Sequence, residues 1–224
     1  TGGVLDTGQT FAYRTPISWA LAAGDGTRTV FAQWRDSVGN WSGVSSDGIL
    51  VDTTAPVSGS IQVQGGASST NVRDVTLTLS ASDGSGTGVT QARLSNTADF
   101  AASSLVPYAT SVPWTLPAGD GSKTVYVKYL DALGNESGAV SDAITLDQTP
   151  PTPGAVEING GASVTATTTA TIVISGSAGD ATQARAANRA DMVGAVSVPL
   201  SGSTAWTLAS GVDGIRTVYV QWAD

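Results

Sequence analysis

Aspartate residues recur at matching places along this chain of 224 residues, and their carboxylates are its best candidates for chemistry. Histidine and cysteine are both absent from the sequence, which removes imidazole bases, thiol nucleophiles and thiolate zinc sites. The aspartates stand among glycine, asparagine and threonine in segments typical of turns. Because Ca²⁺ prefers carboxylate and carbonyl oxygens from flexible loops, binding of this cation is the chemistry to consider first.

Three copies of one sequence pattern carry these aspartates. Each copy joins a tryptophan, a Gly-Asp-Gly-like turn and an alternating apolar run, at 18–36, 113–131 and 205–224. The period is 95 and then 92 residues, measured between Trp19, Trp114 and Trp206. This period is too long for a solenoid repeat and right for a complete small β domain. We therefore expect the chain to be part of a tandem array.

The middle copy predicts a seven-stranded β-sandwich. Short apolar runs with period-two alternation are separated by glycine- and asparagine-rich turn signals. In one of them Val125, Val127 and Tyr129 share a face. The sequence has no helical pattern of useful length, which favours an all-β fold. The expected strands are 60–64, 72–82, 89–96, 105–109, 112–116, 123–131 and 139–146.

Proline-bearing linkers at 52–56 and 147–151 bound the complete copy, because proline prevents a strand from continuing. By alignment with the middle copy, the first and third copies each lack strands of the sandwich. We expect these strands to come either from continuation of the natural protein on both sides or from neighbouring chains by β-strand addition, and we favour continuation. The expected domains are 1–55, the C-terminal part of a repeat; 56–150, a complete repeat; and 151–224, a repeat without its last hairpin and strand.

The pattern W-x-L-x-x-G-D-G-[ST]-[KR]-T-V-x-x-x-[WY]-x-D-x-x-G-N-x-S-G resembles the bacterial Ig-like (fibronectin-III-like) tandem repeats of large secreted and surface proteins. It runs here from Trp114 to Gly138, followed by Ser-Asp-Ala-Ile at 141–144 and by the linker at 147–151. The resemblance covers essentially the whole chain. It implies tandem Ig-like/fibronectin-III-like seven-stranded β-sandwiches with incomplete first and last copies, on an extracellular protein or at a bacterial cell surface.

Strand direction in such a sandwich brings aspartates together at one end of each copy. The incoming linker, the loop after the second strand and the loop after the sixth strand all lie there. Clustered carboxylates without a basic partner repel each other unless a cation neutralises them. The resemblance also implies Ca²⁺ at inter-repeat junctions, since similar arrays carry it between modules. The predicted ligands are Asp52, Asp83 and Asp131 at the first junction, and Asp147, Asp180 and Asp224 at the second.

The same residues also have a simpler interpretation, and both stay open. Asp-x-x-Gly-Asn is common hairpin-turn chemistry, because the aspartate caps local N–H groups and glycine and asparagine tolerate positive φ. As a Ca²⁺ site the first junction would gain a carbonyl from Asn135, and Asn40 stands in the matching loop beside Asp36. The Gly-Asp-Gly at 119–121 is expected to be a tight turn without metal, because it offers one carboxylate per copy.

Aromatic residues form the second group of candidates. The three repeated tryptophans each precede a leucine by two positions, which predicts core positions. Phe31, Tyr126 and Tyr219 fall on the opposite face of their strand from the valines. There they either make a tyrosine-corner-like contact or form stacking positions for sugar rings. Trp41 lies in a loop, where it either folds back onto its own module or binds a partner.

Charge and motifs decide the class of function that we expect. The net charge of −8 argues against nucleic acid, and the sequence has neither a membrane-spanning apolar stretch nor a nucleotide-binding fingerprint. We predict a non-enzymatic stalk or fibre segment of an extracellular bacterial multi-domain protein, adhesive or structural, acting as a semi-rigid spacer between neighbouring repeats. The alternatives are a carbohydrate-binding accessory module of a secreted enzyme, with extracellular polysaccharide as partner, and a self-assembling filament subunit completed by strand exchange.

Overall fold

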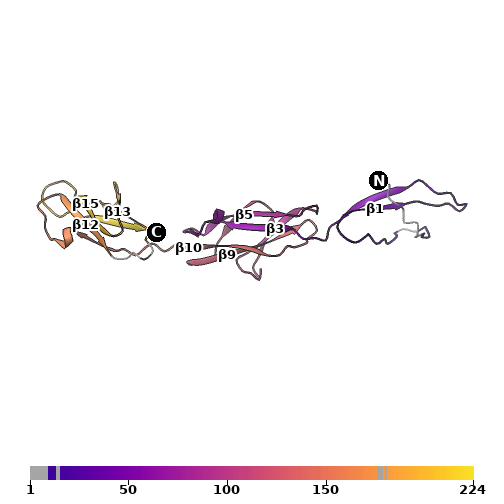
Figure 1. Cartoon of the computed structure of the whole chain (residues 1–224), viewed down its shortest axis with the longest axis horizontal. Helices are drawn as coiled ribbons and strands as arrows, with labels where there is room; N and C mark the ends of the chain where they lie inside the picture. The colour runs from indigo at the N-terminus through magenta and orange to yellow at the C-terminus, as the bar shows by residue number, and fades with distance from the viewer. Residues whose placement is uncertain (1–9, 14–15, 176–178, 180) are drawn as a thin grey trace. The chain divides into compact units, whose positions relative to one another are not determined.

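The computed structural model describes residues 10–13, 16–175, 179 and 181–224 (Figure 1). It divides into two compact units, Thr1–Gln148 and Thr149–Asp224. The described residues form strands and two single-turn 3-10 helices, η1 (Gln64–Gly66) and η2 (Asn159–Gly161), so the predicted all-β fold is confirmed. In this part of the chain there is no helix long and apolar enough to cross a membrane.

The first unit contains the complete sandwich, whose two sheets are built from the predicted strands. The first sheet has the order β3 (Val57–Val63), β5 (Asp74–Ser82), β8 (Ser111–Thr115). The second has the order β4 (Ser69–Thr70), β10 (Val140–Leu146), β9 (Gly121–Asp131), β6 (Val89–Ser95), β7 (Ser104–Pro107). All pairs are antiparallel except β4 with β10. The seven expected strands are therefore present, and β4 is an eighth, two-residue strand at a sheet edge.

The core of this sandwich comes from alternate positions of both sheets. Leu77 and Leu79 of β5 are fully buried with Val125 and Val127 of β9 in one cluster. The period-two alternation seen in the sequence thus corresponds to one buried and one outer face per strand. Trp114 is half-buried against this cluster.

A bulge in β3 lies against Tyr129, the largest fully buried side chain among the described residues. The pairing of β3 with β5 shifts register between Val57 and Ser60, and Ser58 has a φ of +55°. A Cβ added at Gly59 would lie 2.8 Å from Tyr129 Cε2. The Tyr129 hydroxyl donates a hydrogen bond to the Ser60 carbonyl. Burial raises the pKa of Tyr129 to about 12, so the hydroxyl stays a neutral donor at physiological pH.

Gly59→Ala is expected to destabilise the middle repeat by about 1–3 kcal/mol, because the new methyl group overlaps a ring that has no free space to enter. Amide hydrogen exchange of β5 and β9 residues measures this loss for the repeat itself. Gly138→Ala is the matched control, since a Cβ there meets no atom within 4 Å. Equal exchange in the two variants would show that the bulge adapts to a side chain.

The first repeat is represented by one hairpin, β1 (Gly26–Ala32) paired with β2 (Ser45–Val51). Trp19 lies outside any strand, is 44% exposed and contacts Phe11 edge to face at 6.1 Å. The prediction that Trp19 is a core residue is therefore wrong. Its environment differs because the described residues before β1 form no strands that would supply an opposing layer.

The second unit contains the third repeat, with two three-stranded sheets. Trp206 is buried in its core and donates its ring N–H to Asn188 Oδ1 at 2.8 Å. Trp114 makes the same bond to Asn96 at 2.9 Å, so the pair is a repeated feature of the fold. The sheets have the orders β11 (Ala155–Ile158), β12 (Thr169–Ser175), β15 (Gly202–Thr207) and β14 (Val196–Val198), β13 (Gln183–Ala187), β16 (Tyr219–Ala223).

Candidate functional site

The structure brings together Asp52, Asp83 and Asp131. Asp52 follows β2 in the linker, Asp83 follows β5, and Asp131 is the last residue of β9. One carboxylate oxygen of each lies within 4.8 Å of those of the other two. Asp52 is 5% exposed and Asp131 is 2% exposed, while Asp83 is half-buried. The linker thus places a buried carboxylate against two loops of the repeat that it enters.

Backbone N–H groups of the loop after β5 hold two of these carboxylates. Asp52 Oδ2 accepts a hydrogen bond from Thr87 N at 2.7 Å, and Asp83 Oδ2 accepts one from Gly88 N at 2.7 Å. Gly86 passes close to both side chains: a Cβ there would overlap the Asp83 carboxylate and lie 2.8 Å from Asp52 Oδ2. Only glycine fits at this position of the loop.

Asp131 organises the turn between β9 and β10. Its Oδ1 accepts hydrogen bonds from Leu133 N at 2.9 Å and Asn135 N at 2.8 Å, and its Oδ2 accepts one from Asn135 Nδ2 at 2.7 Å. Burial alone raises the pKa of Asp131, but these bonds and one from Gly134 outweigh it, and the net pKa lies below its ordinary value. Asp131 is therefore ionised at neutral pH although it is buried.

Asn135 contacts both the acidic cluster and the linker through its side-chain amide, and its predicted contribution of a carbonyl to a Ca²⁺ site stays a prediction. Its Nδ2 donates to Asp131 Oδ2 and also to the Asp52 carbonyl at 3.3 Å. The Nδ2 group therefore ties the loop to the incoming linker.

The first repeat shows what part of this arrangement is ordinary turn chemistry. Asp36 accepts hydrogen bonds from Val38 N at 3.0 Å, Asn40 N at 2.8 Å and Asn40 Nδ2 at 2.9 Å, the same three contacts that Asp131 makes. Turn formation thus accounts for these bonds of Asp131. The feature specific to the junction is the approach of Asp52 and Asp83.

The charges of the three carboxylates are not balanced by a basic side chain in the part of the chain that the structure describes. The ion pairs found there are Arg93–Glu136, Lys128–Glu136 and Arg189–Asp191. Buried charges need compensation, and three oxygens within 4.8 Å of one another suit a cation with Ca²⁺–O distances near 2.4 Å. Among the described residues, Thr87 Oγ1 is buried without a hydrogen-bond partner beside this cluster. The donor set therefore fits Ca²⁺.

The second predicted group is divided between the two units and a residue outside the described ranges. Asp147 belongs to the first unit and Asp224 to the second. Asp180 lies outside the described residues. A Ca²⁺ site formed by Asp147, Asp180 and Asp224 stays a prediction.

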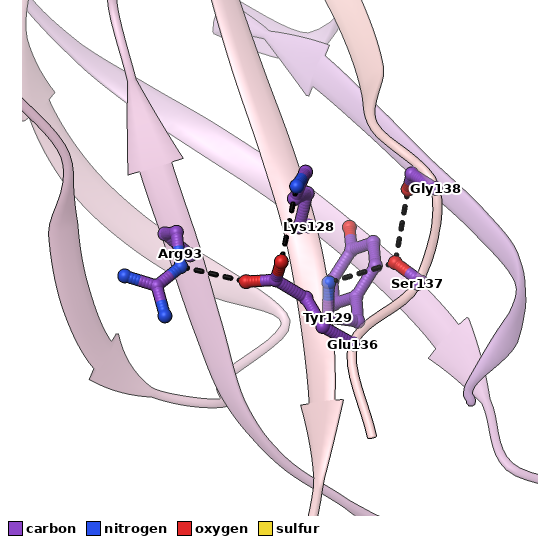
Figure 2. Close-up of polar contacts among 6 residues, drawn as sticks. All are labelled: Arg93, Lys128, Tyr129, Glu136, Ser137 and Gly138. Atoms are coloured by element: carbon purple, nitrogen blue, oxygen red, sulfur yellow. Dashed lines mark hydrogen bonds and ion pairs between the residues drawn. The ribbon is translucent and has the colours of Figure 1, made fainter. Parts of the chain in front are cut away.

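The residue after Asn135 in the loop, Glu136, contacts strands β6 and β9 of the sheet to which the loop belongs (Figure 2). Glu136 accepts a hydrogen bond from Arg93 Nε at 2.7 Å and pairs with Lys128 Nζ at 3.0 Å. Desolvation raises the pKa of Glu136, but these two cations outweigh it and the net pKa is lowered. The next residue, Ser137, accepts a hydrogen bond from Tyr129 N at 2.9 Å and donates one to the Gly138 carbonyl at 3.0 Å.

The first repeat has Trp41 where the middle repeat has Glu136. Trp41 lies 5.7 Å below the Arg35 guanidinium in a cation–π contact, and it remains 54% exposed. This contact agrees with the interpretation that the Trp41 side chain folds back onto its own module.

The remaining aromatic candidates differ in their surroundings. Tyr126 is half-buried and meets Phe100 edge to face at 6.4 Å. Lys128 Nζ lies 5.1 Å from the centre of the same Phe100 ring. Phe31 and Tyr219 are exposed. Two other tyrosines bond to the backbone of a neighbouring strand: Tyr129, on the opposite face of β9, donates to the Ser60 carbonyl, and the Tyr108 hydroxyl accepts from Ala81 N at 3.2 Å.

No family model matches the sequence, and no curated protein matches it. The chain is similar to a solved structure of the chicken CNTN1 FN1-FN3 domains, with 16% sequence identity and a TM-score of 0.40. The alignment covers 88% of this chain and 72% of that chain. A likeness at this level carries neither the role nor the partners of that protein to this chain. The class of the fold rests on the sheets themselves, which are those of an Ig-like, fibronectin-III-like β-sandwich.

Proposed function

We propose that this chain is a segment of a structural or adhesive array of an extracellular bacterial multi-domain protein, in which tandem sandwiches act as semi-rigid spacers. The array has no catalytic role, and its partners are neighbouring repeats. Ca²⁺ binds at the first junction through Asp52, Asp83 and Asp131 and stiffens the joint.

The observation that carries this proposal is the burial of a linker carboxylate inside the next repeat. Asp52 is 5% exposed and has the carboxylates of Asp83 and Asp131 as neighbours. A cation held by all three joins the linker to two loops of one sandwich, so that the linker loses its freedom to swing. Ca²⁺ contributes only charge compensation and coordination here, and the protein supplies the oxygens.

Adding 10 mM Ca²⁺ in place of EDTA is expected to raise the unfolding midpoint of the middle repeat by roughly 5–15 °C. This follows from a dissociation constant on the order of 10⁻⁴–10⁻³ M, usual for extracellular modules, and from preferential binding to the folded state. Scanning calorimetry of the full chain measures the shift.

Asp83→Asn is expected to abolish the shift, because it removes one of the three carboxylates and leaves a side chain of the same shape. Asp36→Asn is the matched control: this aspartate makes the turn bonds of Asp131 in the first repeat, and its loss should leave the Ca²⁺ response intact. A midpoint that Ca²⁺ does not change, or a shift that survives Asp83→Asn, would reduce the three aspartates to turn residues.

A further inference from the structure

A carboxylate in the turn before β1 contacts the linker that follows β2. Asp25 Oδ1 accepts hydrogen bonds from Thr53 N at 2.9 Å and Thr53 Oγ1 at 2.8 Å. Asp25 Oδ2 accepts a third from Thr54 Oγ1. These partners lie 28 and 29 residues further along the chain, so the contact is tertiary and not local turn chemistry.

The turn that presents Asp25 is fixed by its own residues. Gly24 and Gly26, on either side of Asp25, have φ values of +87° and +117°, which favour glycine. The Arg28 guanidinium donates to the Ala22 carbonyl at 3.1 Å and the Ala23 carbonyl at 3.0 Å. The carboxylate is therefore held in place by the turn before it meets the linker.

The same contact occurs at the end of the middle repeat. Asp120 Oδ1 accepts a hydrogen bond from Gln148 N at 2.8 Å, again 28 residues along the chain. Gly119 and Gly121 have φ values of +85° and +107°, as in the first turn. The two linkers differ in sequence at the contacted residue, Thr53 in one and Gln148 in the other, so the backbone N–H is the shared target.

The linker at 52–54 is consequently held from both sides. Asp25 of the preceding repeat binds Thr53 and Thr54, whereas Asp52 binds Thr87 N of the following repeat. Thr54 belongs to both sets, since its N–H donates to Asp52 Oδ1 at 3.2 Å.

We propose that Asp25 and Asp120 are positioning residues that fix the direction in which the chain leaves each repeat, and that they do so without Ca²⁺. This inference rests on the proposed spacer function and names the contact that sets the joint before any cation binds. It also gives the Gly-Asp-Gly turn a role beyond reversing the chain.

Asp25→Ala in the full chain, with EDTA present, tests the inference by two measurements. Exchange of the Thr53 amide hydrogen should accelerate about tenfold or more, because its charged acceptor is lost. The distribution of distances between spin labels at Ser46→Cys and Ser141→Cys should broaden. The natural sequence has no cysteine and both positions are exposed, so the two labels are unambiguous.

Thr54→Val repeats the test from the linker side and leaves the turn untouched. Asp47→Ala is the control, because within the described residues its carboxylate bonds to the adjacent Gly48 N and not to the linker. The inference would be overturned if Asp25→Ala left Thr53 exchange unchanged, or if exchange became faster while the distance distribution did not broaden. The spacer function would still stand in that case, provided that the distance distribution of the parent chain is narrow. A distribution that is broad in the parent chain, with and without Ca²⁺, would refute the spacer function itself.

Discussion

Tyr129→Ala is expected to destabilise the middle repeat by about 3–5 kcal/mol. The ring is fully buried, meets Tyr108 edge to face at 5.9 Å and fills the space that the bulge at Gly59 leaves open. Its removal creates a cavity between the two sheets and leaves the Ser60 carbonyl without its donor. Hydrogen exchange of core amides on β5 and β9 measures the loss, since a chain of two units does not unfold in one two-state step.

Tyr129→Phe separates packing from hydrogen bonding at the same position. The variant keeps the ring and loses only the hydroxyl, so we expect a cost of about 1 kcal/mol. If both variants cost the same, the bond to Ser60 and not the packing of the ring would dominate. The third repeat has Trp222 at this position, which has no hydroxyl and packs against the core of that repeat, and this favours the packing explanation.

The layers of the sandwich follow from alternation and turn signals alone. Val125, Val127 and Tyr129 occupy one face of β9 in the structure, as their spacing predicts, and the turn residues mark where the strands end. The bulge at Ser58 and Gly59 was not predictable in this way, because its cause is a tyrosine on another strand. Trp19 shows the converse limit: periodicity identifies a face suited to burial, and burial still requires an opposing sheet.

The position of the acidic cluster was predictable, but the roles within it were not. Strand direction is sufficient to place Asp52, Asp83 and Asp131 at the same end of one sandwich. The bonds that the Asn135 Nδ2 group donates depend on neighbours that the sequence does not locate, so its tie to the linker could not be predicted. The contacts of Asp25 are not predictable for a similar reason. The sequence Gly-Asp-Gly indicates a local turn, and the partners of its carboxylate lie in a distant linker.

Gly86→Ala is the second substitution for which we expect a large effect. Its methyl group would overlap the Asp83 carboxylate and lie 2.8 Å from Asp52 Oδ2, so at least one of these groups would have to shift. Both are already bonded to backbone N–H groups, of Gly88 and Thr87 respectively. We expect a loss of about 1–3 kcal/mol from overpacking, together with loss of the stabilisation by Ca²⁺.

The two parts of this loss separate when unfolding is measured in EDTA and in Ca²⁺. Asp83→Asn should remove the Ca²⁺ response and lower the stability in EDTA only slightly. Gly86→Ala should lower the stability under both conditions, because the glycine sets the distance between the carboxylates in the absence of any ion. Gly138→Ala, which has open space, should do neither. A Gly86→Ala chain that keeps its full response to Ca²⁺ would mean that the close approach of Asp52 and Asp83 is a consequence of loop packing and not a requirement for holding a cation.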